Sequence, residues 1–499
     1  MSQKSPMPKN DDFSVLTTAQ EAWPAFEAAV LDAEQEISGG FRIFDFSTKL
    51  ISEKARAIGD TWFDLIEHVV RRGVRFRLVV SDFDPVMATP LHETTWRTMR
   101  QAAALAEVLG PEAAERFIVV PSMHPARAGV LPWLTFLPTV LAKMRARLRT
   151  LNKARLERQA IGLDPQALPT LNTVSHHQKM AVIDRQVLYI GGLDLNPRRF
   201  DTPDHDCIAA ATWSDVQLLL RGDEAEEAAQ HLDTFLDEIS GRKPARPGRH
   251  IRRTLSAPRR VNVWALSPRT LLREIEEDHV QAFQKARHLI YIETQFLRSS
   301  IIADALIAAA EDRAKLSLIL VLPAVPEDVA FEGNLGLDAR YGMALGAKNV
   351  QRVQAAFDGR GCIATPVLPR MAARDAVSVL AGSPIIHVHN KVLICDDDFA
   401  MVGSANLNGR SMRWDTETAL RITERDRIDK LWRACCAHWW SDLPEEGRAI
   451  ETAAAWWQTA VKRNTVSLPE RRNGFLVSHD AEKMQDYQQH LPGVTEDIV

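Results

Sequence analysis

The fold of this chain is decided by two stretches, His177-Gln-Lys179-Met-Ala-Val-Ile-Asp184 and His389-Asn-Lys391-Val-Leu-Ile-Cys-Asp396. They are related by a constant offset of 212 positions (389 − 177 = 212). The agreement continues beyond them at the same offset, in the pairs Gly191 and Gly403, Leu195 and Leu407, Asn196 and Asn408, and Arg198 and Arg410. Unrelated apolar strands seldom keep a polar register over such a length, so we interpret the chain as one structural unit present twice.

Both stretches lie in the same local pattern, an apolar run that ends in aspartate followed by a second run that ends in glycine. This pattern predicts a strand hairpin, and the alternation of side chains along a strand places His177 and Lys179 on one face. Strands are also predicted at 41–46, 74–80, 289–293 and 316–322, with helical segments between the members of each pair. A strand, helix and second strand imply parallel pairing. The sequence therefore predicts an α/β fold with two similar α/β/α halves, each built on a mixed sheet.

The expected boundaries follow from this repeat. We expect a polar N-terminal segment over 1–28, a first half over 29–241, a basic linker over 242–260, a second half over 261–443 and a C-terminal extension over 444–499. The linker carries eight Lys and Arg residues and no acidic residue. It can be a solvated connection or a rim that attracts anions to a nearby site.

Composition bounds the class of protein. The chain has 499 residues, a hydrophobic fraction of 45% and a net charge of −4, which disfavours a surface devoted to nucleic acid. Five cysteines without metal-ligand spacing disfavour a disulfide framework and fit a reducing compartment. The longest apolar run, at 130–142, is shorter than the ~20 residues that a spanning helix needs. We expect a cytoplasmic protein without a secretory leader or transmembrane segment, although export without a leader stays open.

The paired motifs supply the groups that break a phosphodiester. A neutral imidazole can attack phosphorus to form a phosphohistidine, and a protonated one can deliver a proton to the leaving oxygen. Lys179 and Lys391 would hold the nonbridging oxygens, with hydrogen bonds from Ser404 and Asn406. This chemistry requires no metal or other cofactor, and no His, Cys or carboxylate cluster with metal-ligand spacing is present in the sequence.

Further polar residues accompany the motifs. Asp184 and Asp396 belong to the motif set, but at strand ends they are expected to bond backbone groups more readily than to take part in catalysis. His176 and His387 face away from the site by alternation and are interpreted as packing or surface residues. Carboxylates that could orient the catalytic rings are sought downstream, and the positions with similar spacing are Asp206 and Glu417, 29 and 28 residues after the paired histidines.

The whole pattern resembles the phospholipase D superfamily. The resemblance rests on His177-x-Lys179-x4-Asp184-x6-Gly191-Gly-Leu-Asp194 and His389-x-Lys391-x4-Asp396-x6-Gly403-Ser-Ala-Asn406. Tyr291-Ile-Glu-Thr-Gln-Phe296 and Trp213-Ser-Asp-Val-Gln217 also resemble segments of the family, and the similarity runs from about residue 30 to residue 440.

The resemblance implies particular roles. His177 would be the nucleophile and His389 the general acid and then the base, in a site between two halves related by a pseudo-twofold axis. The first motif departs from the second, because Gly192 and Asp194 stand where the second has Ser404 and Asn406. Contacts to the phosphate, including one at Asp194, are therefore expected to be asymmetric.

The substrate class is indicated less directly. In residues 129–158, an apolar piece with Pro132, Trp133, Phe136 and Pro138 precedes seven basic residues, Lys143, Arg145, Arg147, Arg149, Lys153, Arg155 and Arg158. Such a wedge suits the headgroup level of a membrane, whereas the alternative is a core loop followed by a solvated helix.

Several functions remain open on these grounds. We expect a peripheral lipid hydrolase or transphosphatidylase acting on phospholipids such as phosphatidylcholine. The alternatives are a cardiolipin synthase-like phosphatidyltransferase, a nuclease of the same superfamily and a non-catalytic scaffold. Nucleic acid is the less favoured partner, and a monomer is compatible with the sequence.

Overall fold

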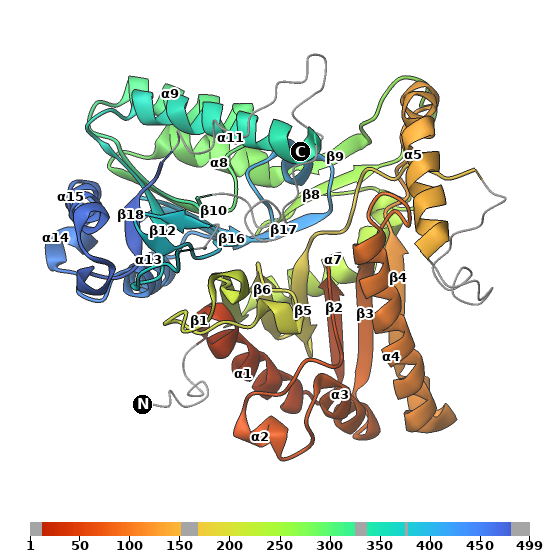
Figure 1. Ribbon diagram of the computed structural model, residues 1–499. Helices are drawn as coiled ribbons and strands as arrows, with labels where there is room; N and C mark the ends of the chain where they lie inside the picture. The colour runs from red at the N-terminus through yellow and green to blue at the C-terminus, as the bar shows by residue number, and fades with distance from the viewer. Residues whose placement is uncertain (1–11, 151–167, 325–336, 375–377, 481–499) are drawn as a thin grey trace.

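Two mixed sheets, one in each half of the chain, face each other and carry helices on both of their faces (Figure 1). The computed structural model describes residues 12–150, 168–324, 337–374 and 378–480. No helix within these ranges is both long and apolar enough to cross a bilayer.

The first half contains a seven-stranded sheet. Its strands are β1 Phe13–Thr17, β2 Glu36–Phe41, β3 Arg75–Asp82, β4 Phe117–Met123, β5 Lys179–Ile183, β6 Val187–Gly191 and β7 Val216–Arg221. Its helices are α1 Thr18–Leu31, α2 Glu53–Arg56, α3 Trp62–Arg71, α4 Thr89–Ala114, α5 Val130–Thr150 and α7 Asp223–Ile239, with 3-10 turns η1 Pro197–Arg199 and η2 Ala209–Ala211.

The second half contains a nine-stranded sheet and a short hairpin. Its strands are β8 Ile251–Ala257, β9 Arg269–Arg273, β10 Leu289–Thr294, β11 Ser317–Val321, β12 Gly361–Pro366, β13 Val379–Leu380, β14 Ser383–Pro384, β15 Lys391–Cys395, β16 Phe399–Gly403, β17 Glu417–Ile422 and β18 Leu476–Ser478. Its helices are α8 Glu274–Lys285, α9 Ser300–Asp312, α11 Leu337–Ala356, α12 Gly409–Arg413, α13 Arg425–Trp439, α14 Glu445–Arg448 and α15 Ala453–Val466, with the 3-10 turn η3 Pro469–Arg471.

The strand orders show the duplication directly. The first sheet runs β1-β7-β6-β5-β2-β3-β4 and the second β18-β12-β11-β10-β15-β16-β17-β8-β9. In each, three parallel strands (β2, β3 and β4; β10, β11 and β12) adjoin an antiparallel set that begins with the motif strand, β5 or β15. The predicted fold of two similar α/β halves with mixed sheets is confirmed.

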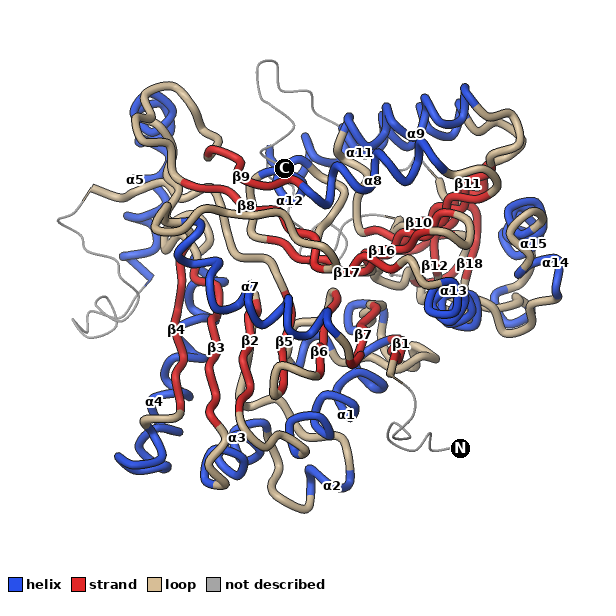
Figure 2. Tube along the Cα trace, turned by 180° about the vertical axis from the view of Figure 1, so that it is seen from behind, coloured by secondary structure: helices blue, strands red, loops and turns tan. Residues whose placement is uncertain are grey.

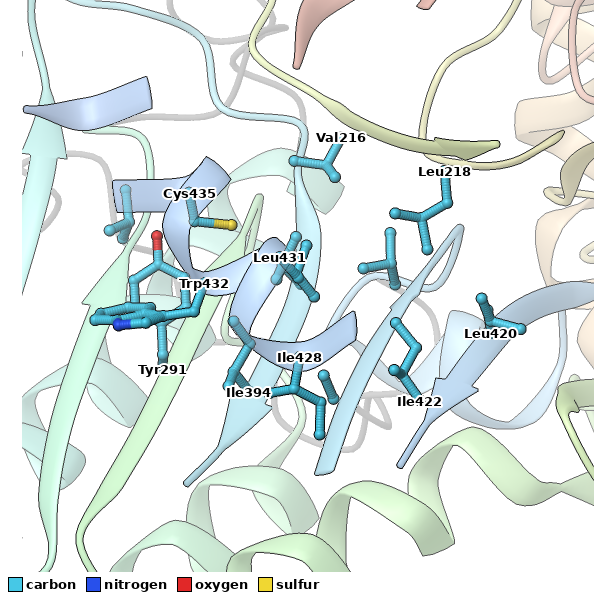
Figure 3. Packing of buried hydrophobic residues seen from close by; sticks show 14 of the residues in the cluster. Val216, Leu218, Tyr291, Ile394, Leu420, Ile422, Ile428, Leu431, Trp432 and Cys435 are labelled. Carbon is cyan, nitrogen blue, oxygen red and sulfur yellow. The ribbon is translucent and has the colours of Figure 1, made fainter. Parts of the chain in front are cut away.

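The core between the sheets is formed by alternate residues of the strands and by two helices. Met180 and Val182 of β5 point to this central core, while Ala181 and Ile183 point to the outer core under α1, α3 and α4. Helices α7 and α13 lie between the sheets (Figures 1 and 2). Figure 3 shows Leu431 of α13 between the labelled side chains of the two sheets. Because the central core takes residues from both halves, their association is built into folding.

Three predicted boundaries are wrong. β1 and α1 belong to the first half, so it starts well before residue 29. β8, inside the predicted linker, pairs with β17 of the second sheet, and β18, inside the predicted extension, pairs with β12. The linker was misread because its charges suggested solvent exposure.

Two of the linker's arginines are neutralised by acids on neighbouring helices. Arg252 contacts Glu274 at 3.1 Å and Asp278 at 2.8 Å. Arg253 contacts Glu238 at 2.9 Å. All five side chains are largely buried, so these two arginines are not part of a rim that attracts anions.

Candidate active site

The segment that leads into each motif is bonded to the closing strand of the opposite half. The backbone N–H of His177 donates to the carbonyl of Thr416 at 2.8 Å, and that of His389 donates to the carbonyl of Ser214 at 2.8 Å. Parallel bridges join His176 to Thr416 and Ser214 to Val388. The two contacts are equivalents under the duplication, so the motifs meet at the boundary between the halves.

Each motif imidazole is held by a carboxylate from the other half. The oxygens of Glu417 lie 3.0 and 3.1 Å from Nδ1 of His177, which also lies 3.1 Å from the carbonyl oxygen of Ser404. An oxygen of Asp215 lies 2.6 Å from Nδ1 of His389. A carboxylate at Nδ1 favours the tautomer that carries its proton there, which leaves the Nε2 lone pair for chemistry.

One of the two predicted orienting carboxylates is wrong. Glu417 does hold a motif histidine, although it is His177 of the other half. Asp206 is exposed, and Asp215 occupies the position expected of it. The count from the histidine failed because the first half has a longer connection before its closing strand, 38 residues from His177 to Asp215 against 28 from His389 to Glu417 (215 − 177 = 38; 417 − 389 = 28). Aligning Ser214-Asp215 with Thr416-Glu417 by strand would have found it.

The two motif lysines are buried between the imidazoles and the carboxylates. Each ammonium donates to the carbonyl of the histidine two residues before it, at 2.6 Å from Lys179, and likewise from Lys391 to His389. Burial lowers the pKa of Lys179, and it lowers the pKa of Lys391 to about 7. The charges of Asp194, Asp215 and Glu417 act in the opposite direction on both lysines, which places all five groups in one electrostatic cluster.

Burial shifts the pKa of each dyad member toward its neutral form. It raises the pKa of Asp215 to about 7 and that of Glu417 to about 8, although nearby lysines oppose both shifts. It also lowers the pKa of His177 and His389, assisted by the positive charges of Lys179 and Lys391. The empty site therefore favours neutral imidazoles, as a nucleophile requires.

The predicted phosphate contacts are placed unevenly. Ser404 gives its hydroxyl hydrogen bond to Glu417, and Asp194 accepts from the backbone N–H of Ile43 at 2.9 Å. Asn406 is buried, and the oxygen of its amide has no hydrogen-bond partner among the described residues. At Gly192 an added Cβ would lie 2.0 Å from Asp215, so in the first half the carboxylate occupies the space that a side chain fills in the second.

The motif aspartates have the same structural role in both halves. Asp184 accepts from the backbone N–H groups of Glu34, Gln35 and Glu36 at 2.9, 2.7 and 2.8 Å. Asp396 accepts from those of Arg287, His288 and Leu289 at 2.6, 2.9 and 2.8 Å.

Each aspartate thereby fixes the start of the neighbouring strand, β2 or β10. Both lie at the end of the motif strand away from the lysine, and both have positive φ, 51° and 52°. The inclusion of Asp184 and Asp396 among the catalytic residues is therefore not supported, whereas the expectation that they bond backbone groups agrees with the geometry.

Arg42 is a site residue that the sequence did not indicate. It directly follows β2, and its positive charge acts on both His177 and Lys179. The position at which β10 ends in the second half carries Gln295, so the duplication gives no signal for this arginine. His176, by contrast, packs internally, with its ring nitrogens near Ser122 and Thr416. Within the described ranges, no three His, Cys, Asp or Glu side chains gather in an arrangement that could hold a metal ion.

Comparison with known proteins agrees with this geometry. A family described as "Cardiolipin synthase, PLD-like domain" matches residues 279–439. Phospholipase D1 of Schizosaccharomyces pombe is 24% identical over 345 residues, which cover 51% of this chain and 25% of that protein. Phospholipase D A of Dictyostelium discoideum is 24% identical over 318 residues, covering 52% of this chain and 25% of the relative. The chain thus spans about a quarter of the length of these relatives.

A solved structure extends the likeness to both halves. The phosphatidylserine synthase of Haemophilus influenzae superposes with a TM-score of 0.51 at 11% identity, covering 86% of this chain and 85% of that one. This likeness concerns the fold. Together with the paired motifs and the relatives above, it leads to one conclusion: the chain belongs to the phospholipase D superfamily.

Proposed function

We propose that this protein is a phospholipase D-type phosphodiesterase that cleaves the headgroup phosphodiester of glycerophospholipids through a phosphohistidine intermediate. The observation that carries the proposal is the pair of imidazoles, each oriented by a carboxylate of the opposite half, beside two buried lysines. This arrangement provides a nucleophile, a proton donor and positive charge for the phosphoryl oxygens in one place.

The first step forms a bond between Nε2 of His177 and phosphorus. The bond from phosphorus to the leaving oxygen breaks as His389 donates its proton to that oxygen. In the second step His389 removes a proton from water or an alcohol, whose oxygen attacks phosphorus while the phosphorus–nitrogen bond breaks. Hydrolysis and transphosphatidylation differ only in this acceptor.

Charge balance supplies the proton that His389 needs. In the empty site the lysines and burial keep both imidazoles neutral. A phosphodiester brings one negative charge next to Lys179 and Lys391 and thereby reduces their repulsion of an imidazolium. Substrate binding is therefore coupled to protonation of His389, which Asp215 stabilises from the other side.

The substrate class is supported by the names of the relatives and by the lipid-facing features described in the next subsection. A phosphatidyltransferase of the cardiolipin synthase kind is the second candidate, because the family that matches residues 279–439 carries that description. A nuclease is the third, and it predicts binding that weakens steeply with salt.

A single set of assays tests the proposal. Phosphatidylcholine, phosphatidylglycerol and single-stranded DNA are offered in parallel to the wild type, to His177→Asn and to an Asp206→Asn control. We expect release of the lipid headgroup by the wild type and the control, and its loss in His177→Asn. Cleavage of DNA alone, or lipid cleavage that survives His177→Asn, would contradict it.

A further inference from the structure

Exposed apolar side chains gather where the start of α5 meets the connection between β8 and β9 (Figure 1). We name this surface the apolar tip, and its residues are Val130, Leu131, Leu134, Val261, Val263 and Trp264. Trp264 is 79% exposed and Val261 80% exposed, the latter being the second highest exposure among the large apolar residues described. The two contributing segments lie about 130 residues apart in sequence, so their meeting is a product of the fold.

The apolar tip is held by backbone hydrogen bonds. The N–H groups of Gly129, Val130 and Leu131, at the start of α5, donate to the carbonyls of Ala265, Asn262 and Val263 at 2.8, 3.1 and 2.9 Å. These are the donors that a helix start leaves without intrahelical partners. The connection between β8 and β9 thus caps α5, and both segments keep a fixed relation to each other.

The base of the tip is packed against the body of the first half. Trp133 donates its indole N–H to the carbonyl of Pro169 at 2.9 Å, and Val140 and Met144 of α5 are buried with Val86. The predicted wedge is therefore corrected in part: Trp133 faces the body, whereas Leu134 and Phe136 face solvent. The predicted basic residues Lys153, Arg155 and Arg158 lie outside the described residues.

The surroundings of the tip are positively charged. Neither contributing stretch contains an acidic residue, from 116 to 156 or from 239 to 273. Arg127, Arg259 and Arg260 are exposed beside the tip. A surface with large exposed apolar side chains and a one-signed basic margin is complementary to an anionic phospholipid interface, where both parts find partners.

The tip is connected to the catalytic motif. The chain from residue 168 to the first motif passes beneath it, where the N–H of Ala128 donates to the carbonyl of Leu171 at 2.9 Å and the hydroxyl of Thr173 donates to that of Leu266 at 3.2 Å. Four residues after Thr173 the same segment reaches His177. The tip therefore lies on the side of the first sheet from which its catalytic histidine enters.

We propose that the apolar tip docks this protein on the surface of an anionic phospholipid bilayer, with Trp264 and Leu134 inserted among the headgroups and Arg259 and Arg260 contacting lipid phosphates. This inference rests on the proposed lipid phosphodiesterase function, for which it names the physical state of the substrate. The tip brings the site to lipids that remain in the bilayer.

The test compares tip variants with matched surface controls in vesicle flotation, using vesicles of phosphatidylcholine mixed with phosphatidylglycerol. The apolar variant is Trp264→Ser with Leu134→Ser, and its control is Val466→Ser with Leu468→Ser at the exposed end of α15. We expect partitioning to weaken by about tenfold for each large apolar side chain removed from the tip, and to be unchanged in the control.

A charge-reversed pair tests the basic margin separately. Arg259→Glu with Arg260→Glu is expected to weaken partitioning by at least about fivefold per residue, whereas Lys462→Glu with Arg463→Glu on α15 leaves it near the wild-type value. Equal losses in tip and control variants, or no loss in either tip variant, would overturn the proposal. So would a wild type that does not float with these vesicles, which would assign the tip to a protein partner.

Activity on a monomeric short-chain phosphatidylglycerol separates this inference from the proposed function. The tip variants should cleave it at the wild-type rate while losing activity on vesicles. If the wild type cleaves neither substrate, the proposed function fails, and flotation still decides whether the tip binds lipid. If the tip variants lose both activities equally, docking is not the role of the tip.

Discussion

Replacing Asp396 or Asp184 by Asn separates the structural role of the motif aspartates from catalysis. Each carboxylate accepts three backbone N–H groups at the start of a neighbouring parallel strand. Asn keeps one acceptor oxygen, turns the other into a donor that faces an N–H, and removes the charge. It also tolerates the positive φ at these positions, so the change isolates the carboxylate from backbone strain.

The expected cost follows from burial. A hydrogen bond to a charged group contributes about 1.5–3 kcal/mol net, and a neutral one about 1 kcal/mol. The substitution loses one bond outright and weakens two. Asp396 is buried, so we expect about 3 kcal/mol of destabilisation for Asp396→Asn. Asp184 is partly exposed, and since water can satisfy the freed donors, about half of that is expected for Asp184→Asn.

The assay combines urea denaturation with activity per folded molecule. Because Asp184 lies five strand residues from Lys179, roughly 16 Å along β5, we expect kcat/KM within about threefold of the wild type. The double variant should show additive destabilisation, since the two sites share no partner. Unchanged stability together with a loss of activity of about a hundredfold or more would refute the reasoning and return the aspartates to the chemistry.

The other predictions concern the cluster itself. Asp215→Asn should lower kcat by about 10²–10⁴ with little change in KM, because the imidazole loses its orientation and its stabilising charge, and Asp206→Asn should change neither; steady-state kinetics decide, and equal effects of the two would contradict the assignment. Burial lowers the pKa of Lys391 to about 7, so its positive charge is present below that pH and lost above it. A profile of kcat/KM against pH should therefore fall on the alkaline side of about 7, and Lys391→Arg should move that limb upward because Arg stays charged; an unchanged limb would assign it to another group. Arg42→Ala should raise KM for an anionic diester by about tenfold with a smaller effect on kcat, as measured by initial rates, and the lack of any KM change would remove Arg42 from the phosphate site.

The duplication made the sheets and the motif residues predictable. A fixed offset identified both hairpins, and alternation along a strand identified the residues that share a face. The orienting carboxylates were harder to find because a count along the chain works only where the connections have equal length. The first half has ten more residues between its histidine and its closing strand (38 − 28 = 10), which moved the prediction from Asp215 to Asp206.

Two other features could not be read from local sequence. The crossing of carboxylates between the halves depends on the placement of Ser214 and Thr416 beside the opposite motifs, and a repeat does not specify it. The basic stretch around β8 looked solvated because the acids that neutralise Arg252 and Arg253 come from α7 and α8. The apolar tip likewise needs the meeting of α5 with a connection that the sequence had assigned to a linker and the start of the second half.

The asymmetry between the two dyads gives a physical reason for unequal roles of the imidazoles. Asp215 lies 2.6 Å from His389, in the space left open by Gly192. Glu417 is shared between His177 and the hydroxyl of Ser404, and the distances to His177 are longer, 3.0 and 3.1 Å. Burial also raises the pKa of Glu417 to about 8, against about 7 for Asp215, so Glu417 is the weaker source of negative charge near neutral pH. A short contact to the more ionised carboxylate stabilises an imidazolium, which suits His389 for proton transfer, and His177 is left as the neutral ring that attacks phosphorus.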